Sequence, residues 1–170
     1  VIKHLPGHGR GAVDSHKELP RVDTDLAILR REDFSAFRPL NHLPLGMSAH
    51  VVYSAIDPDS PGTVSAPVIE TLVRGDIGFD GFLFTDDISM QALQGSLAER
   101  AGAAIAAGCD AVLHCSGVLS EMVEVAGAVT GLSQSADTRW TRARAARHKP
   151  EGADIDALAA ALVAQFQDGT

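Results

Sequence analysis

The chain has 170 residues, enough for one domain with a substantial hydrophobic core. Apolar residues make up 45% and charged residues 21% of it, which excludes a disordered chain, and no apolar run approaches the roughly 18 residues of a membrane span. The net charge is −8 and Lys and Arg are not clustered, so we expect neither nucleic acid nor a membrane as a partner.

Strand-like and helix-like segments alternate along the chain. Short apolar stretches predict four buried strands, at residues 1–4, 45–49, 82–84 and 111–114. Capped amphipathic or Ala-rich segments predict helices, at residues 33–40, 65–74, 97–107, 119–129, 138–147 and 154–166. We place N-caps at Asp33 and Ser65 and a C-cap at Gly108. A strand followed by a helix and another strand is the signature of parallel βαβ units with right-handed connections.

These segments make about four βα units, half of the eight that close a (β/α)₈ barrel of about 250 residues. The chain also opens directly on a strand. We therefore predict an α/β fold that is the C-terminal half of a TIM-type (β/α)₈ barrel, with residues 1–170 as one partial barrel domain. A small open α/β domain is the alternative. A half-barrel has two free sheet edges, so inward-facing side chains should meet atoms from elsewhere, namely those among Ile2, Leu45, Met47, Leu83 and Val112 or Leu113 that point inward.

The two cysteines flank the last predicted strand. At about 3.3 Å per residue, the Cα atoms of Cys109 and Cys115 would lie roughly 20 Å apart. A disulfide requires a separation below about 7 Å. We expect two free thiols, which favours a reducing compartment, and a cytoplasmic protein.

A pair of aspartates, Asp86 and Asp87, follows the predicted strand at 82–84. The carboxyl end of a strand is where α/β barrel enzymes carry their chemistry. A carboxylate there can act as a nucleophile toward a sugar carbon, as a metal ligand or as a general base. One of the two can also serve only as a helix N-cap, and adjacent strand residues point in different directions, so at most one faces the barrel mouth.

The loop after the first strand is rich in Gly, His and Asp. Asp14 lies two residues before His16, where a carboxylate can fix the tautomer of the imidazole and raise its basicity, although such a pair is also common in surface turns. The glycines of segment 7–11 lack the Lys-Ser/Thr that a phosphate-binding loop requires. The four candidate zinc ligands are His4, His8, Asp14 and His16. A zinc site requires a regular arrangement of its ligands, which two glycines and a proline in this segment disfavour, so we predict no metal there.

Four segments together resemble the signature of the family 3 glycoside hydrolases. They are Lys3-His4-Leu5-Pro6-Gly7-His8-Gly9, Asp14-Ser15-His16, Ala49-His50-Val51-Val52-Tyr53, and Gly78 to Met90. The match is to the β-N-acetylhexosaminidase branch, which removes terminal N-acetylglucosamine and acts in peptidoglycan recycling. It covers residues 1–115 in order and spacing. One position differs, because Ser48 stands where the family more often has Pro.

This resemblance implies a retaining exo-β-N-acetylglucosaminidase that needs no cofactor. It assigns Asp86 as the nucleophile that forms a covalent glycosyl-enzyme, and His16 as the acid/base with Asp14 as its partner. An Asp-paired imidazole titrates near neutral pH and can both donate and accept a proton. Residues expected to bind the substrate, an N-acetylglucosamine-containing saccharide, are Lys3, His4, His50 and Met90.

The resemblance also implies that the family's barrel begins upstream of Lys3, with four more strands that supply further sugar ligands. The N-terminal half is therefore expected from upstream sequence or from another chain. Two other functions stay open. A β-N-acetylglucosaminide phosphorylase is one, because a histidine in the acid/base position repels phosphate less than a carboxylate does. A non-catalytic half-barrel subunit is the other.

Overall fold

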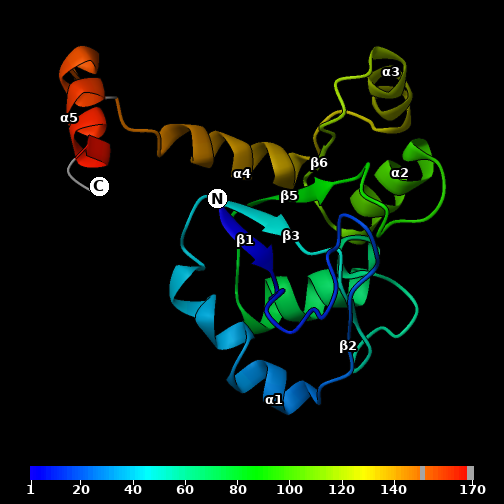
Figure 1. The fold of residues 1–170 in the computed structure, drawn as a ribbon. Helices are drawn as coiled ribbons and strands as arrows, with labels where there is room; N and C mark the ends of the chain where they lie inside the picture. Colours follow the sequence, from blue (N-terminus) through cyan, green and yellow to red (C-terminus); the bar gives the residue numbers. More distant parts are fainter. Residues whose placement is uncertain (150–151, 168–170) are drawn as a thin grey trace.

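The computed structural model describes residues 1–149 and 152–167, and its centre is a four-stranded parallel sheet (Figure 1). The sheet has the order β1-β3-β5-β6, formed by β1 (Ile2–Leu5), β3 (Leu45–Ser48), β5 (Phe82–Asp87) and β6 (Ala111–Leu113). A separate two-stranded parallel sheet pairs β2 (Arg21–Val22) with β4 (Val52–Tyr53).

Helical segments follow and connect the strands. In chain order they are α1 (Leu26–Arg31), η1 (Phe34–Ala36), η2 (Arg38–Leu40), η3 (Gly62–Val64), η4 (Val68–Asp76), α2 (Leu97–Ala107), α3 (Leu119–Ala128), α4 (Gln134–Ala145) and α5 (Ile155–Gln167). The helix α2 occupies the predicted residues, with a capping box between Ser96 and Glu99 and with Gly108 left-handed at its end. The cap predicted at Ser65 is also present, since its Oγ accepts a hydrogen bond from the backbone N–H of Val68.

The prediction of a helix at residues 33–40 is wrong. This segment forms the two short 3₁₀ turns η1 and η2, and the α-helix lies earlier, at α1, where the Asp25 side chain caps the N–H of Ala27. Pro39 has no N–H to donate to the carbonyl of Ser35, so it interrupts an α-helical hydrogen-bond ladder through this segment. Asp33 makes no side-chain capping bond there.

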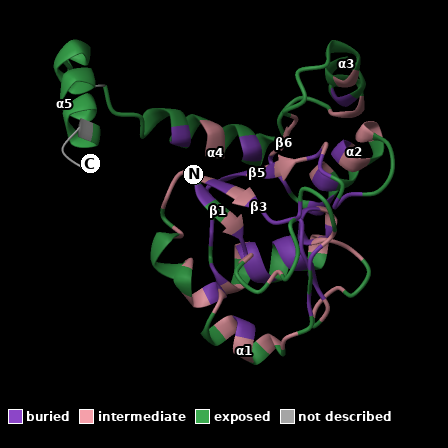
Figure 2. Cartoon of the chain, viewed as in Figure 1, coloured by how far each residue is buried: buried purple, intermediate pink, exposed green. Residues whose placement is uncertain are grey.

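The strands of the sheet contain both buried and half-buried residues (Figure 2). A Cβ added at Gly46 would lie 2.7 Å from the Phe79 ring and 2.8 Å from Leu5, so this position faces the tightly packed helical side. Its neighbours Leu45 and Met47 point to the opposite face by strand alternation and are only half-buried. The barrel-interior face of the sheet is therefore incompletely covered by the described residues.

The barrel is not closed, because β1 and β6 stand at opposite edges of the sheet and do not pair with each other. This confirms the α/β half-barrel prediction. Ile2 and Leu83 pair in register with Gly46, so they point to the helical side and are buried in the chain's own core cluster. The expectation for inward-facing residues therefore does not apply to these two. Val112 packs against the smaller cluster that contains Val125 of α3.

The last helices extend from this body. Trp140 of α4 covers Phe82, with 5.2 Å between ring centroids, and so shields the beginning of β5. The helix α5 lies apart from the sheet (Figure 1) and exposes apolar side chains along its length, namely Ile155, Leu158, Leu162, Val163 and Phe166. Among the described helices, none has both the length and the apolar character needed to cross a bilayer.

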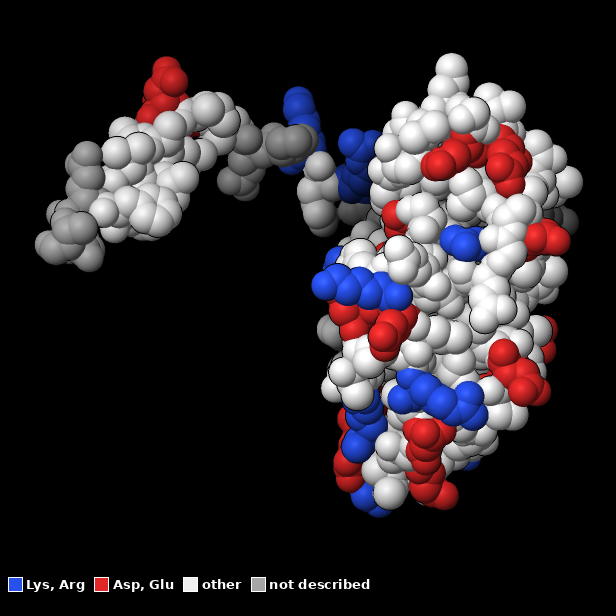
Figure 3. Space-filling model, turned by 45° about the vertical axis from the view of Figure 1, so that its right-hand side comes forward, with Lys and Arg blue, Asp and Glu red and all other residues white. Residues whose placement is uncertain are grey.

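Surface charge and thiol state fit the composition. On the face drawn in Figure 3, acidic and basic side chains are interspersed and no continuous basic surface forms. Cys109 is buried and Cys115 is exposed, and both are free thiols as predicted. Burial raises the pKa of the Cys109 thiol to about 12, so this side chain is an inert part of the core.

Candidate active site

The two aspartates lie inside the end of β5 rather than after it. One carboxylate oxygen of Asp86, Oδ1, accepts a hydrogen bond of 2.8 Å from the backbone N–H of Asp87. The other, Oδ2, lies 3.4 Å from Nε2 of His4 on β1. The Asp86 side chain keeps 18% of its surface exposed. It is thus a fixed carboxylate at the carboxyl end of the sheet, with one oxygen directed toward the first strand.

Asp87 has a different environment. Its Oδ1 accepts from the backbone N–H of Ser89 and of Cys115, and its Oδ2 accepts from the Ser89 hydroxyl at 2.6 Å. Partial burial alone would raise the pKa of this carboxyl, but the bonds from Ser89 and Cys115 outweigh it and the pKa is lowered. Asp87 therefore ties the end of β5 to the segment after β6.

His4 and Lys3 stand at the rim of an open pocket beside β1. The pocket has a volume of about 330 Å³ and is also lined by His8, whose ring packs edge-on against that of His4 at 5.8 Å between centroids. Partial burial lowers the pKa of His4, and the charge of Asp86 opposes this shift only in part. A neutral imidazole beside Asp86 leaves the negative charge of that carboxylate uncancelled.

Asp14 and His16 form the predicted pair. Nδ1 of His16 lies 2.8 Å from Oδ1 of Asp14, which also accepts from the His16 backbone N–H at 3.0 Å. These two bonds, the backbone one first, hold the pKa of Asp14 below its ordinary value. The His16 side chain is 75% exposed, and no hydrogen bond or ion pair joins it to Asp86 in the part of the chain that the structure describes.

The loop that carries this pair is held by contacts that sequence reasoning missed. Arg10 binds Asp33 and Glu32, each at 2.7 Å. Ser15 is buried, and its hydroxyl lies 3.3 Å from Nε2 of His8. No sequence signal connected Arg10 with an acidic pair more than twenty residues away. The loop is therefore attached through Arg10, within its glycine segment, and through Ser15, while His16 itself faces solvent.

His50 and Met90, both expected to bind substrate, are buried in this part of the barrel. Their exposed fractions are 1% and 6%. Both ring nitrogens of His50 are engaged, Nδ1 with Thr63 Oγ1 at 2.7 Å and Nε2 with the Asp87 carbonyl at 3.0 Å. In this structure His50 lies beneath the aspartates and has no free atom to offer a sugar. The motif identified the residue but gave no information on its burial.

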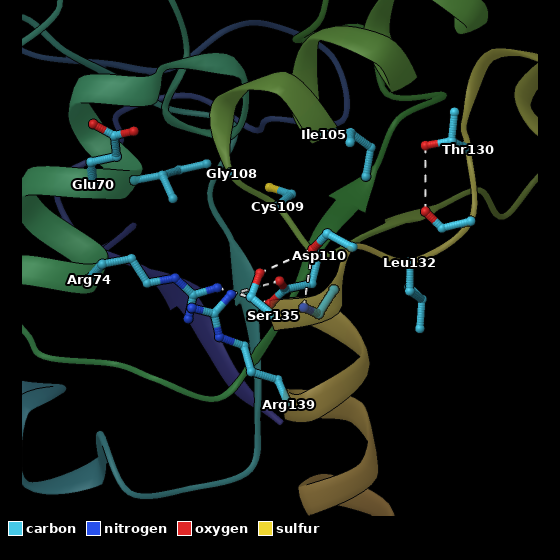
Figure 4. A pocket seen from close by; sticks show the side chains of 14 residues that line it. Glu70, Arg74, Ile105, Gly108, Cys109, Asp110, Thr130, Leu132, Ser135 and Arg139 are labelled. Carbon is cyan, nitrogen blue, oxygen red and sulfur yellow. Dashed lines mark hydrogen bonds and ion pairs between the residues drawn. The ribbon is translucent and has the colours of Figure 1, made fainter.

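A second pocket, drawn in Figure 4, lies at the other end of the sheet. Arg74 and Arg139 converge there on Asp110, with nitrogen–oxygen distances of 2.9 Å. Arg74 also donates to the carbonyls of Phe79 and Gly81, just before β5 begins. Both carboxylate oxygens of Asp110 are paired in this network, which secures the amino ends of β5 and β6, away from the aspartate pair.

The zinc shell considered from the sequence does not form among the described residues. No group of three or more His, Cys, Asp or Glu side chains is arranged there to hold a metal ion. His4 and His8 pack edge to face, while Asp14 and His16 pair at the surface.

Comparison with known proteins decides the family. The family model described as glycosyl hydrolase family 3 N terminal domain matches residues 1–144, most of the chain. The chain belongs to this family.

Curated relatives in the family are named β-hexosaminidases. The one from Alkalilimnicola ehrlichii is 48% identical over 120 residues, which cover 68% of this chain and 34% of the relative. The one from Pseudomonas aeruginosa is 36% identical over 176 aligned positions, which cover 98% of this chain and 52% of the relative. The chain thus spans between a third and about half of the length of these relatives.

Solved family 3 structures share the fold. Native NagZ from Neisseria gonorrhoeae superposes with a TM-score of 0.71 at 32% identity, covering 94% of this chain and 45% of that one. A family 3 β-N-acetylglucosaminidase from Paenibacillus gives 0.73 at 28% identity, covering 91% of this chain and 33% of that one. The half-barrel therefore corresponds to part of a larger family 3 enzyme fold.

Proposed function

We propose that the complete protein carrying this chain is a retaining exo-β-N-acetylglucosaminidase. The observation that supports this most is the carboxylate of Asp86, fixed at the end of β5 with Oδ2 beside His4. Membership of family 3 and similarity to proteins named β-hexosaminidase and β-N-acetylglucosaminidase indicate the substrate class, a terminal β-linked N-acetylglucosamine.

In the first step, Oδ2 of Asp86 attacks the anomeric carbon while the bond to the leaving oxygen breaks. His16 gives its Nε2 proton to that oxygen, since Nδ1 is already held by Asp14. The product of this step is a covalent glycosyl-aspartate. In the second step water attacks the same carbon, His16 takes the proton of the water, and Asp86 is released with overall retention.

His16 has to approach the sugar for this chemistry, and its exposed position on a glycine-containing loop is compatible with such a movement. Lys3 and His4, at the rim of the open pocket, are the proposed ligands of the sugar hydroxyls. The remaining sugar contacts are proposed to come from the other half of the barrel, supplied by upstream sequence or by another chain.

We further propose peptidoglycan fragments as the natural source of the substrate and the cytoplasm as the location. Two free thiols and the similarity to NagZ support this proposal. Saccharides from other polymers with the same terminal sugar are the competing substrates.

The direct test is turnover of an aryl N-acetyl-β-glucosaminide by the complete protein, with the first anomer identified by proton NMR. The β-anomer as first product supports the retaining mechanism, and the α-anomer contradicts it. A phosphorylase remains the second candidate, because His16 is not a carboxylate. Adding inorganic phosphate separates the two, since a phosphorylase forms the sugar 1-phosphate and a hydrolase the free sugar. No turnover under either condition would favour the non-catalytic subunit.

A further inference from the structure

A set of buried polar side chains lies directly beneath the aspartate pair. Ser48, His50 and Thr63 have exposed fractions of 1%, 1% and 0%. Ser48 Oγ lies 2.7 Å from Thr63 Oγ1, which lies 2.7 Å from Nδ1 of His50. Nε2 of His50 lies 3.0 Å from the carbonyl oxygen of Asp87. Buried polar groups are costly unless paired, and the side-chain atoms of this set are paired with one another or with that carbonyl.

The Asp87 carbonyl determines which group donates in each hydrogen bond among these side chains. A carbonyl oxygen only accepts, so Nε2 of His50 carries a hydrogen. In the neutral ring Nδ1 must then accept, and the Thr63 hydroxyl donates to it. The Thr63 oxygen in turn accepts from the Ser48 hydroxyl. Burial lowers the pKa of His50, which favours this neutral form.

The position of His50 shows that these buried side chains hold the end of β5. Met47 of β3 pairs with Phe84 of β5, and His50 and Asp87 each lie three residues further along. The side-chain bond from His50 to the Asp87 carbonyl thus continues the cross-strand register where the backbone ladder has ended. On its other side, the N–H of Asp87 donates to Oδ1 of Asp86 at 2.8 Å.

We propose that His50, oriented by Thr63, is a positioning residue for Asp86 and acts through the peptide groups on either side of Asp87. The proposal rests on the proposed role of Asp86 as nucleophile. His50 itself does not touch the substrate. Its contribution is alignment, because a nucleophile displaced by about 1 Å from its target can lose on the order of a hundredfold in rate.

Kinetics of matched variants in the complete protein test this role. Thr63→Val keeps the size of the side chain but removes the hydroxyl, so kcat should fall by about tenfold or more while KM changes by less than about threefold. Thr63→Ser keeps the hydroxyl and should restore most of the rate. His50→Gln, which can still donate to the Asp87 carbonyl, should retain more activity than His50→Leu.

Ser65→Ala is the matched control. Ser65 is equally buried, but its hydroxyl bonds Asp57 and caps η4 without joining this set, so kcat should stay unchanged. Full kcat in Thr63→Val would overturn the proposal. So would an equal loss in Thr63→Ser and Thr63→Val.

A measurement that needs no turnover separates this proposal from the proposed function. In the complete protein labelled with ¹⁵N-histidine, His50 should give the Nε2–H tautomer at pH 7. Thr63→Val should shift the Nδ1 resonance of His50 alone among the histidines. An Nδ1–H tautomer of His50 at pH 7 overturns the positioning role even if the protein hydrolyses its substrate.

Discussion

Nε2 of His4 and Oδ2 of Asp86 lie 3.4 Å apart, although β1 and β5 are separated in the sheet by β3. The contact crosses the carboxyl end of the sheet and directs one carboxylate oxygen toward β1. Because burial lowers the pKa of His4, the imidazole stays neutral near pH 7 and the negative charge of Asp86 is retained. A charged carboxylate with one oxygen available is what a glycosidic nucleophile requires.

Replacing Asp86 should remove activity. Asp86→Asn in the complete protein preserves the side-chain shape without the charge, and kcat on an aryl N-acetyl-β-glucosaminide should fall by at least about 10³-fold. Asp87→Ala is the comparison, and it should reduce kcat less because that side chain orients the strand end. A larger loss for Asp87→Ala than for Asp86→Asn would exchange the two roles.

Removing the imidazole of His16 should make the rate depend on the leaving group. His16→Ala should slow substrates with poor leaving groups by a much larger factor than activated aryl substrates, since an activated group departs without a proton. The measurement is kcat/KM across a series of aryl glycosides of increasing leaving-group pKa. A loss that is the same for the whole series would mean that His16 only supports the loop.

The fold could be predicted best where local signals agree. Ser96, Glu99 and Gly108 mark both ends of α2, and the helix occupies the predicted residues. The prediction of a helix at 33–40 is wrong because Asp33, a residue type common at N-caps, binds Arg10 instead of capping a helix. The two-residue strands β2 and β4 carry no periodicity that a sequence pattern can reveal.

The motifs predicted which residues form the site, but they did not predict how far those residues are buried. Asp14 and His16 are adjacent in sequence, so their pairing follows from local geometry. The burial of His50 depends on Thr63 and on the end of β5, which lie far from it in the chain. Such long-range contacts leave no trace in the spacing of residues, so the sequence does not reveal that both ring nitrogens of His50 are engaged.

Acid should destabilise the fold through the buried histidines. Burial lowers the pKa of His50 and of His4 below the ordinary histidine value of 6.5, so the unfolded chain binds these protons at a higher pH than the folded chain does. The contribution of these two histidines to the free energy of unfolding is therefore fully present above about pH 6.5. It decreases as the pH falls toward their pKa values in the folded chain. Urea unfolding of the complete protein at several pH values measures this slope.

The histidine variant serves as the control for this prediction. His50→Gln should show a shallower loss of stability between about pH 7 and pH 5 than the unmodified protein. An equal slope in both proteins would exclude His50 as the source. Stability that increased on acidification would contradict the sign.

Close packing at Gly46 should make this position intolerant of a side chain. Gly46→Ala places a Cβ 2.7 Å from Phe79 and 2.8 Å from Leu5, and overpacking of this kind costs about 1–3 kcal/mol in the free energy of unfolding. The control is Gly102→Ala within α2, where no atom lies within 4 Å of the added Cβ. That change should stabilise the helix by about 0.5–1 kcal/mol. Denaturant unfolding of both variants gives the comparison, and similar stabilities for the two would contradict the packing argument.

The role of Asp86 is tested most directly by trapping the covalent intermediate. A fluorinated N-acetylglucosaminide with a good leaving group should react with the complete protein and accumulate as a glycosyl-enzyme, because fluorine slows the second step. Peptide mapping by mass spectrometry should then locate the added sugar on Asp86. A sugar attached to Asp87, or substrate turnover with inversion and no trapped adduct, would contradict the account.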